Sequence, residues 1–271
     1  MRNEFGFTFK KISPINAHEI IEATYVLTME NSKRNFAKEL DRFSPSMNTY
    51  IVIAESFKKN QRPLCKQAPV YDIVFSYVQI FKHAQLYHKN KPILLLEDDF
   101  FWGENVDPLP EIIKDIMLFL NDTPSVDHYW LGCIPLPSLQ LPQKIGKHVK
   151  IDSRTLASHS VISTTKGMAS FIKTFEERPC AIEFPDPYMS ENHLCYRYHE
   201  QLCYQLFEQT QNQNQNWPKI LQYVTKALHL DKRAEPCWTL FYVLHDNFLI
   251  SVGIIVVIVF IVITLTLSKK K

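Results

Sequence analysis

The chain has 271 residues but only six glycines, and it contains none of the common glycine-rich phosphate-binding motifs. The patterns GxGxxG, Walker A and GxSxG are all absent, which argues against a dinucleotide-binding enzyme, a P-loop NTPase and an α/β-hydrolase. The formal net charge is only +2, and no stripe of Arg and Lys is interleaved with aromatic residues. A nucleic-acid partner is therefore not expected, and a metal-dependent nuclease would lack the basic surface that its substrate needs.

The six cysteines are scattered along the chain, and no two of them form a CxxC pair. This spacing argues against a zinc cluster. A disulfide framework is not expected in so long a chain, and a reducing compartment fits this cysteine usage. The N-terminus has no apolar run that would serve as a signal peptide.

A long uncharged segment lies near the C-terminus, at residues 248–267. A helix of this length spans roughly 30 Å, the thickness of the hydrocarbon core of a bilayer. We therefore predict a single-pass transmembrane helix at 248–267, a basic tail at 268–271 and a juxtamembrane connection at 231–247. Without a signal peptide, the domain at 1–230 is expected in the cytosol, although the terminal lysines favour the opposite orientation and leave a lumenal domain open.

Strands alternate with helices before that segment. Strands are predicted at 23–28, 49–54, 92–96, 128–131 and 158–164, and helices at 32–42, 70–89, 109–120, from 166 onward and at 218–230. This alternation predicts an α/β fold with a mainly parallel sheet flanked by helices. Ligands of such sheets bind beyond the carboxyl ends of the strands.

Three adjacent carboxylates, Glu97, Asp98 and Asp99, follow the most hydrophobic of these strands. Because side chains alternate across a strand, Glu97 and Asp99 are expected to point one way and Asp98 the other. Adjacent carboxylates raise one another's pKa unless a cation lies between them. A hard divalent cation with oxygen ligands resolves that conflict, so the triplet predicts a site for Mn²⁺ or Mg²⁺, with a solvated acidic turn as the alternative.

Several segments, in this order, resemble glycosyltransferase family 25, which groups lipopolysaccharide-type and procollagen galactosyltransferases with relatives in large DNA viruses. The segment 25–34 resembles the opening strand of the family and its turn near the nucleotide, and 95–99 resembles its L-E-D-D metal motif. Shorter matches follow at 129–132, 158–163 and 185–186, so the resemblance covers roughly residues 22–217. The chain departs from the family pattern at Tyr77 and Val161, where the family has His and Tyr.

The resemblance implies a GT-A-like fold and transfer of a hexose, with inversion, from a UDP-sugar to an acceptor hydroxyl of a protein or glycan. It implies Mn²⁺ or Mg²⁺ as cofactor, held by the acidic triplet.

The family resemblance also implies roles for five further residues. Thr28, Glu30 and Arg34 lie in the segment near the nucleotide, where the Arg34 fork suits a phosphate. His159 is a candidate contact of the diphosphate or the metal, and Asp186 is the candidate base. The alternatives are a surface arginine, a core histidine and a plain turn aspartate. The alternative function is a catalytically inactive, membrane-anchored binding or structural protein.

Overall fold

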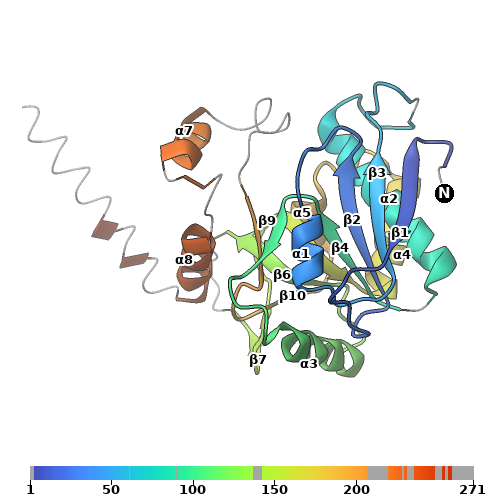
Figure 1. Ribbon diagram of the computed structural model, residues 1–271. Coiled ribbons are helices and arrows are strands. Elements are labelled where there is room, and N and C mark those ends of the chain that lie inside the picture. The colour runs from blue at the N-terminus through green and yellow to red at the C-terminus, as the bar shows by residue number, and fades with distance from the viewer. Residues whose placement is uncertain are drawn as a thin grey trace, which may run out of the picture.

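The computed structural model describes residues 3–60, 62–89, 91–136, 142–206, 219–227, 229–230, 235–247, 252–253 and 256–257. A nine-stranded sheet forms the centre of this structure, and helices flank both of its faces (Figure 1). The strand order in the sheet is β1-β3-β2-β4-β9-β6-β10-β8-β7, and β5 and β11 form a second, two-stranded sheet.

The elements have the following bounds. The strands are β1 (Phe7–Ile12), β2 (Ala23–Met29), β3 (Thr49–Ala54), β4 (Ile93–Glu97), β5 (Phe100–Trp102), β6 (His128–Pro135), β7 (Lys144–Ile145), β8 (His148–Lys150), β9 (Thr155–Ser163), β10 (Cys195–Tyr198) and β11 (Cys203–Gln205). The helices are α1 (Ala37–Arg42), α2 (Pro69–Tyr87), α3 (Leu109–Asp122), α4 (Thr165–Glu177), α5 (Pro185–Asn192), α7 (Lys219–Ala227) and α8 (Glu235–Asp246).

The main sheet is mixed. Strand β2 pairs in parallel with both β3 and β4, and β6 pairs in parallel with β10, but β9 runs antiparallel between β4 and β6. The predicted α/β class is confirmed, whereas the mainly parallel sheet is wrong because antiparallel pairs outnumber parallel ones. The physical reason lies in residues 128–163, where four strands follow one another without the crossover helix that a parallel connection needs.

The apolar run of β4 explains how the layers are held together. Ile93 and Leu95 belong to a buried cluster with α2, α4 and α5, whereas Leu94 and Leu96 belong to a second cluster with α1 and α3. All four side chains are fully buried. Strand β4 is therefore covered on both faces, as its continuous hydrophobic sequence predicted.

Helix α1 begins later than its sequence suggested. The sequence predicted a helix at 32–42, but α1 starts at Ala37, after Phe36 as its N-cap residue. The Ser32 hydroxyl instead accepts a hydrogen bond from the Arg34 backbone N–H at 3.4 Å, a local turn that competes with helix formation. Arg34 consequently lies in the loop that leaves β2, not on the surface of a helix.

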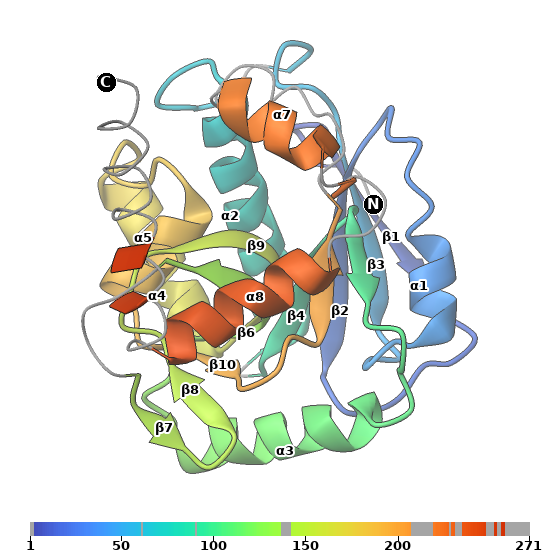
Figure 2. The same cartoon turned by 90° about the vertical axis from the view of Figure 1, so that its left-hand side faces the viewer.

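Helix α8 packs on the domain, although it lies in the segment 231–247 that was predicted as a juxtamembrane connection. Trp238 and Tyr242 are buried against the sheet, and the buried Arg197 guanidinium of β10 forms an ion pair with Asp246. Figure 2 shows α8 lying across the domain in front of β4, β6 and β10. The folded unit thus extends to the end of α8.

Within the described residues, we find no helix with the length and apolar character needed to cross a membrane. The predicted transmembrane helix at 248–267 lies almost entirely outside these residues, since only 252–253 and 256–257 are described. The basic tail at 268–271 also lies outside them. Both therefore stay predictions.

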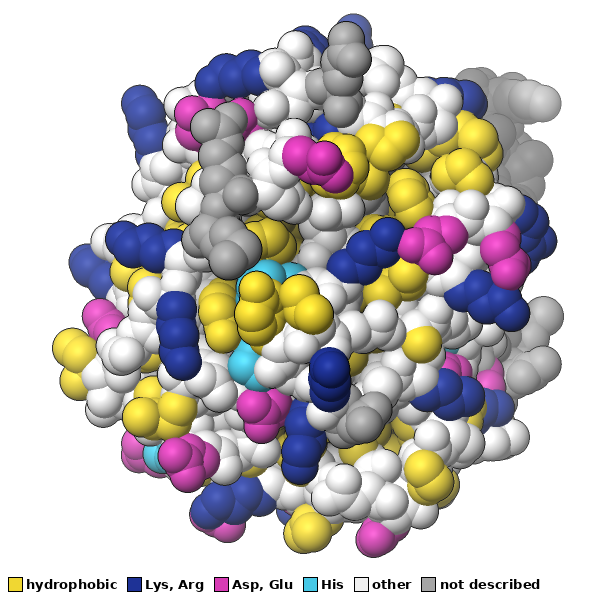
Figure 3. Space-filling view, turned by 90° about the vertical axis from the view of Figure 1, so that its right-hand side faces the viewer, with side chains coloured by type: hydrophobic (Ala, Val, Ile, Leu, Met, Phe, Trp, Pro, Cys, Tyr) yellow, Lys and Arg dark blue, Asp and Glu magenta, His cyan; other side chains and the backbone are white. Residues whose placement is uncertain are grey.

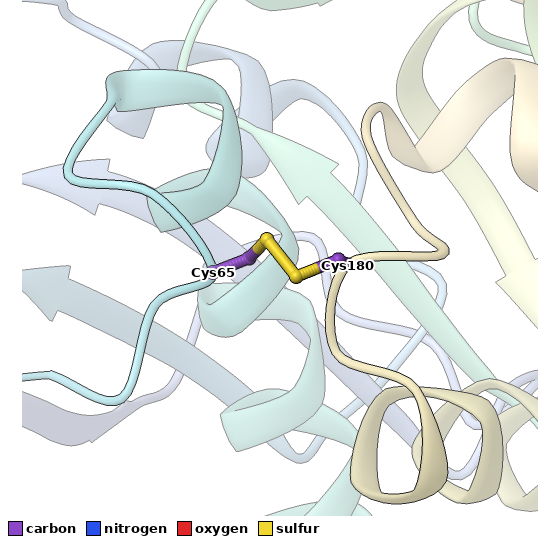
Figure 4. The surroundings of a disulfide bond; sticks show 2 residues. All are labelled: Cys65 and Cys180. Atoms are coloured by element: carbon purple, nitrogen blue, oxygen red, sulfur yellow. A yellow bond between two sulfur atoms is a disulfide. The ribbon is translucent and has the colours of Figure 1, made fainter.

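Cys65 and Cys180 form a disulfide, which the sequence had not predicted. The bond joins the loop before α2 to the turn after α4 (Figure 4), and the two Cα atoms are 5.2 Å apart although 115 residues separate them in sequence. The expectation of unpaired cysteines is thus wrong for this pair, because sequence spacing does not show which cysteines approach one another. Among the described cysteines, 133, 195, 203 and 237 are free thiols.

One face of the domain shows how the surface charge is distributed. Figure 3 shows Lys and Arg side chains alternating with Asp and Glu side chains, with apolar side chains between them. Ion pairs between elements also occur on the surface, such as Lys82 of α2 and Glu176 of α4 at 2.6 Å. That face therefore carries no field of a single sign.

Candidate functional site

The acidic triplet lies at the carboxyl end of β4, next to the carboxyl end of β2. Glu97 is the last residue of β4 and lies opposite Leu27 of β2 in the parallel register. Asp98 and Asp99 form the turn that leads into β5. The loop after β2, which contains Arg34, is brought to this edge of the sheet because parallel neighbours end side by side.

Asp98 is held by two groups from β2 and the loop that follows. The Thr28 hydroxyl donates to its Oδ2 at 2.5 Å, and Arg34 Nη1 donates to its Oδ1 at 2.5 Å. The Asp98 side chain is about nine-tenths buried, while the Arg34 side chain is 20% exposed. Arg34 therefore contacts a buried carboxylate while part of its own side chain remains accessible to solvent.

Asp99 shares the same guanidinium. Its Oδ2 lies 3.2 Å from Arg34 Nη1 and accepts a hydrogen bond from Gln205 Nε2 at 2.8 Å. Its Oδ1 is buried, and no hydrogen-bond partner for it is found within the described part of the chain. Burial raises the pKa of Asp99 to about 6, although the charge of Arg34 opposes this shift.

No pattern in the sequence indicated that Gln205 belongs to the site. It reaches Asp99 because β11 pairs antiparallel with β5, which places Gln205 opposite Phe100. A pairing between strands about a hundred residues apart is a property of the fold, so local sequence patterns do not reveal it.

Glu97 has a different hydrogen-bond partner from the other two carboxylates. Its Oε1 accepts a hydrogen bond from the Tyr77 hydroxyl of α2 at 3.0 Å. Burial, followed by the negative charges of Asp99 and Asp186, raises the pKa of Glu97 to about 8. Consistent with this split, no group of three or more His, Cys, Asp or Glu side chains in the described ranges is arranged to hold a metal ion.

Asp186, the predicted base, lies in the first turn of α5. Its Oδ2 accepts a hydrogen bond from the Ala157 backbone N–H at 2.6 Å, and Ala157 has a positive φ of 66°. The carboxylate thus supports a strained position in β9. The negative charge of Asp186 also contributes to the raised pKa of Glu97.

Glu30 and His159 make contacts elsewhere. Glu30 is exposed, and its Oε2 lies 2.5 Å from Nζ of Lys59. His159 is fully buried, its Nε2 lies 3.2 Å from the carbonyl oxygen of Cys203, and its ring packs edge-on against Trp238. Burial lowers the pKa of His159 to about 4. The environment of His159 is that of a neutral core histidine.

The carboxylate pair of Asp98 and Asp99 fits a divalent cation, although the full triplet does not converge. The buried Asp99 Oδ1 is a hard oxygen donor with no described partner. Mg²⁺ is commonly held by only one or two carboxylates, with water and substrate phosphates completing its shell. Arg34 supplies part of the positive charge that such a pair requires.

Comparison with known proteins gives only distant similarity. No protein-family model matches the chain, and no curated protein matches its sequence. Among solved structures, A197 from STIV matches with a TM-score of 0.42 and 10% identity, covering 69% of this chain and 87% of that one. A glycosyltransferase involved in the glycosylation of the major capsid of PBCV-1 matches with a TM-score of 0.40 and 9% identity, covering 70% and 94%.

A third structure, apo-UDP-glucose pyrophosphorylase, has a TM-score of 0.32 and 9% identity, covering 65% of this chain and 72% of that one. Similarity at this level concerns the fold alone and carries no information about activity. What the chain can do chemically therefore has to be argued from its own site.

Proposed function

We propose that the chain is a metal-dependent glycosyltransferase that moves a hexose from a UDP-sugar to a hydroxyl group of a protein or glycan. The observation that carries this proposal is the buried pair of Asp98 and Asp99 at the carboxyl end of β4, joined to Arg34 from the loop after β2. A diphosphate needs both a cation and a hydrogen-bond donor that reaches its oxygens. This edge of the sheet offers carboxylates for the first and a guanidinium for the second.

Arg34 is the group of this chain that binds the diphosphate. Its planar guanidinium presents several N–H donors, which allows it to keep one carboxylate contact while it donates to phosphate oxygens. Thr28 holds the orientation of Asp98 through its hydroxyl hydrogen bond. The Mn²⁺ or Mg²⁺ ion, when bound at Asp98 and Asp99, supplies Lewis-acid stabilisation of the UDP leaving group.

Asp186 takes the proton of the acceptor hydroxyl. As the acceptor oxygen forms its bond to the anomeric carbon, the bond from that carbon to the UDP oxygen breaks and UDP leaves with the electron pair. The backbone N–H of Ala157 fixes one carboxylate oxygen of Asp186. A general base held in this way has a defined direction toward the acceptor.

A second candidate function is a membrane-anchored binding or structural protein that has lost catalysis. Two observations favour it: Arg34 contacts both carboxylates as a bound cation would, and the described residues contain no three-ligand metal group. In that case the Arg34 ion pairs serve the fold, and no donor sugar is turned over.

Titration calorimetry of the full chain in detergent with UDP, with and without Mn²⁺, separates these functions. We expect UDP binding that depends on Mn²⁺ and is lost in Asp99→Asn. The matched control is Asp107→Asn, since Asp107 is exposed and lies outside the site. If UDP plus Mn²⁺ shows no binding, or Asp99→Asn binds like the parent chain, the enzyme proposal is wrong. A screen of UDP-hexoses then identifies the donor.

A further inference from the structure

Helix α8 has an unusual outer surface. Trp238, Tyr242 and His245 form its buried side, at the spacing of one helical face. On the other side, Leu240 is 53% exposed and Val243 is 43% exposed. The outer face of a surface helix normally carries charged and polar side chains, so two large exposed apolar residues on one face need an explanation.

The sequence of α8 also shows the apolar character of this helix. Between Glu235 and Asp246, at its two ends, the helix has no Asp, Glu, Lys or Arg. Helix α3, which also covers the domain, instead carries Glu111, Lys114 and Asp115 on its solvent-facing positions. Helix α3 also exposes Leu118, but charged side chains surround it, whereas no charged side chain lies between Leu240 and Val243 and the two ends of α8.

A β-hairpin lies beside the C-terminal end of α8. Its strands are β7 and β8, and Nζ of Lys144 lies 3.3 Å from Oδ2 of Asp246. At the hairpin, Ile145 is 52% exposed and is flanked by the exposed residues Lys144 and Lys147. The views in Figures 1 and 2 agree that this hairpin and α8 lie at the same side of the domain.

We propose that the outer face of α8, with Leu240 and Val243, and the hairpin tip around Ile145 form a surface that docks on the interfacial layer of a lipid bilayer. The chain itself indicates this occupant, because the uncharged segment 248–267 begins two residues after α8 ends. Two residues extend by about 7 Å at most, so insertion of that segment holds the last turn of α8 at the membrane surface.

The chemistry of the surface matches the interface between headgroups and acyl chains. Leu, Val and Ile side chains insert into the upper acyl region, while the exposed Lys147 is available to anionic headgroups. Helix α8 packs on β6 through Tyr242, whose hydroxyl lies 3.5 Å from Sγ of Cys133 near the carboxyl end of that strand. The docked domain would then present the same end of its sheet, where the carboxylates lie, close to the membrane.

This inference does not depend on catalysis, so its test needs no substrate. The full chain is reconstituted into vesicles of phosphatidylcholine and phosphatidylserine whose acyl chains carry bromine, which quenches nearby tryptophan. The variants Leu240→Trp and Val243→Trp place a fluorescent probe on the proposed surface. The emission of each new tryptophan is obtained by subtracting the emission of the parent chain from that of the variant. Leu86→Trp is the matched control, because Leu86 is 63% exposed but belongs to α2 on the other side of the domain in Figure 1.

We expect the emission added at 240 and 243 to shift to shorter wavelength and to lose most of its intensity in brominated vesicles. The emission added at 86 should keep its intensity. Charge reversal in Lys147→Glu should weaken the quenching at 240, and this effect should disappear at high salt.

Three results would overturn the proposal. The first is quenching at 240 and 243 no stronger than at 86. The second is protection of these positions from soluble acrylamide without quenching by bromine, which would mean that a second copy of the chain or residues 248–267 cover α8. The third is failure of the full chain to float with the vesicles.

Discussion

Removal of Arg34 is the sharpest test of how the acidic site is stabilised. Arg34 Nη1 lies 2.5 Å from Oδ1 of Asp98 and 3.2 Å from Oδ2 of Asp99. Both carboxylate side chains are less than 10% exposed. In Arg34→Ala these two adjacent carboxylates lose the cation that they share, while Thr28 and Gln205 still donate to them.

The expected cost follows from the burial of the partners. Breaking a fully buried ion pair by removing one partner costs roughly 3–5 kcal/mol. Because the Arg34 side chain is 20% exposed, water can partly replace it, and we expect a loss of about 2–3 kcal/mol in the free energy of unfolding. For a domain of this size that corresponds to a decrease in Tm of about 5–10 °C.

Thermal unfolding in the presence of EDTA measures this change, with Arg154→Ala as the matched control. Arg154 forms an ion pair with Glu191 at 3.6 Å, but both side chains are more than half exposed, so its loss should cost no more than about 1 kcal/mol. Mn²⁺ should recover part of the lost Tm in Arg34→Ala. If Arg34→Ala lowers Tm no more than Arg154→Ala does, the guanidinium is not a structural cation of the site.

Three further predictions concern the surroundings of this site. The pKa of Glu97 is raised to about 8 in the folded chain. Its contribution to the free energy of unfolding is therefore complete below the unfolded pKa and is lost as the pH rises through about 8. Urea unfolding at several pH values should show this decline in the parent chain, and Glu97→Gln should remove it. Gly132→Ala should unfold the domain or lower its Tm strongly, because the added Cβ would lie 1.8 Å from the backbone carbonyl oxygen of Cys203. Cys180→Ser should lower the free energy of unfolding by on the order of 2–5 kcal/mol, whereas Cys237→Ser should not, and a reducing agent should abolish this difference.

The disulfide bears on the compartment in which the domain folds. Disulfides persist in oxidising compartments and are rare in the cytosol. A bond between Cys65 and Cys180 would therefore last in an oxidising compartment, whereas the reducing compartment expected from the cysteine spacing would keep both thiols reduced. Protease protection of the domain in sealed microsomes distinguishes a cytosolic from a lumenal domain.

Local sequence patterns predicted the elements that depend on local interactions. The strand at 49–54 coincides with β3, the helix at 70–89 differs from α2 by one or two residues, and the helix at 109–120 contains most of α3. These segments were predictable because apolar spacing and strand length reflect burial along one element. They also fixed the place of the acidic triplet, directly after a strand that is covered on both faces.

Features that depend on pairing between distant segments were not predictable in this way. The antiparallel direction of β9, the contact of Gln205 with Asp99 and the bond between Cys65 and Cys180 all join residues far apart in sequence. Residues 231–247 were interpreted as a connection because they lie between the predicted domain and the uncharged segment 248–267. The buried side of α8, with Trp238 and Tyr242, shows that this helix belongs to the core as well.

The orientation of the three carboxylates illustrates where pattern reasoning ends. Strand alternation predicted that Glu97 and Asp99 would face one way and Asp98 the other. Strand β4 ends at Glu97, and the turn that follows releases the next two residues from that alternation. Asp98 and Asp99 can therefore converge on Arg34, while Glu97 remains in the strand and contacts Tyr77. A cation at this site would accordingly be held by the turn, while Glu97, whose pKa is raised by burial, keeps its hydrogen bond to Tyr77 of α2.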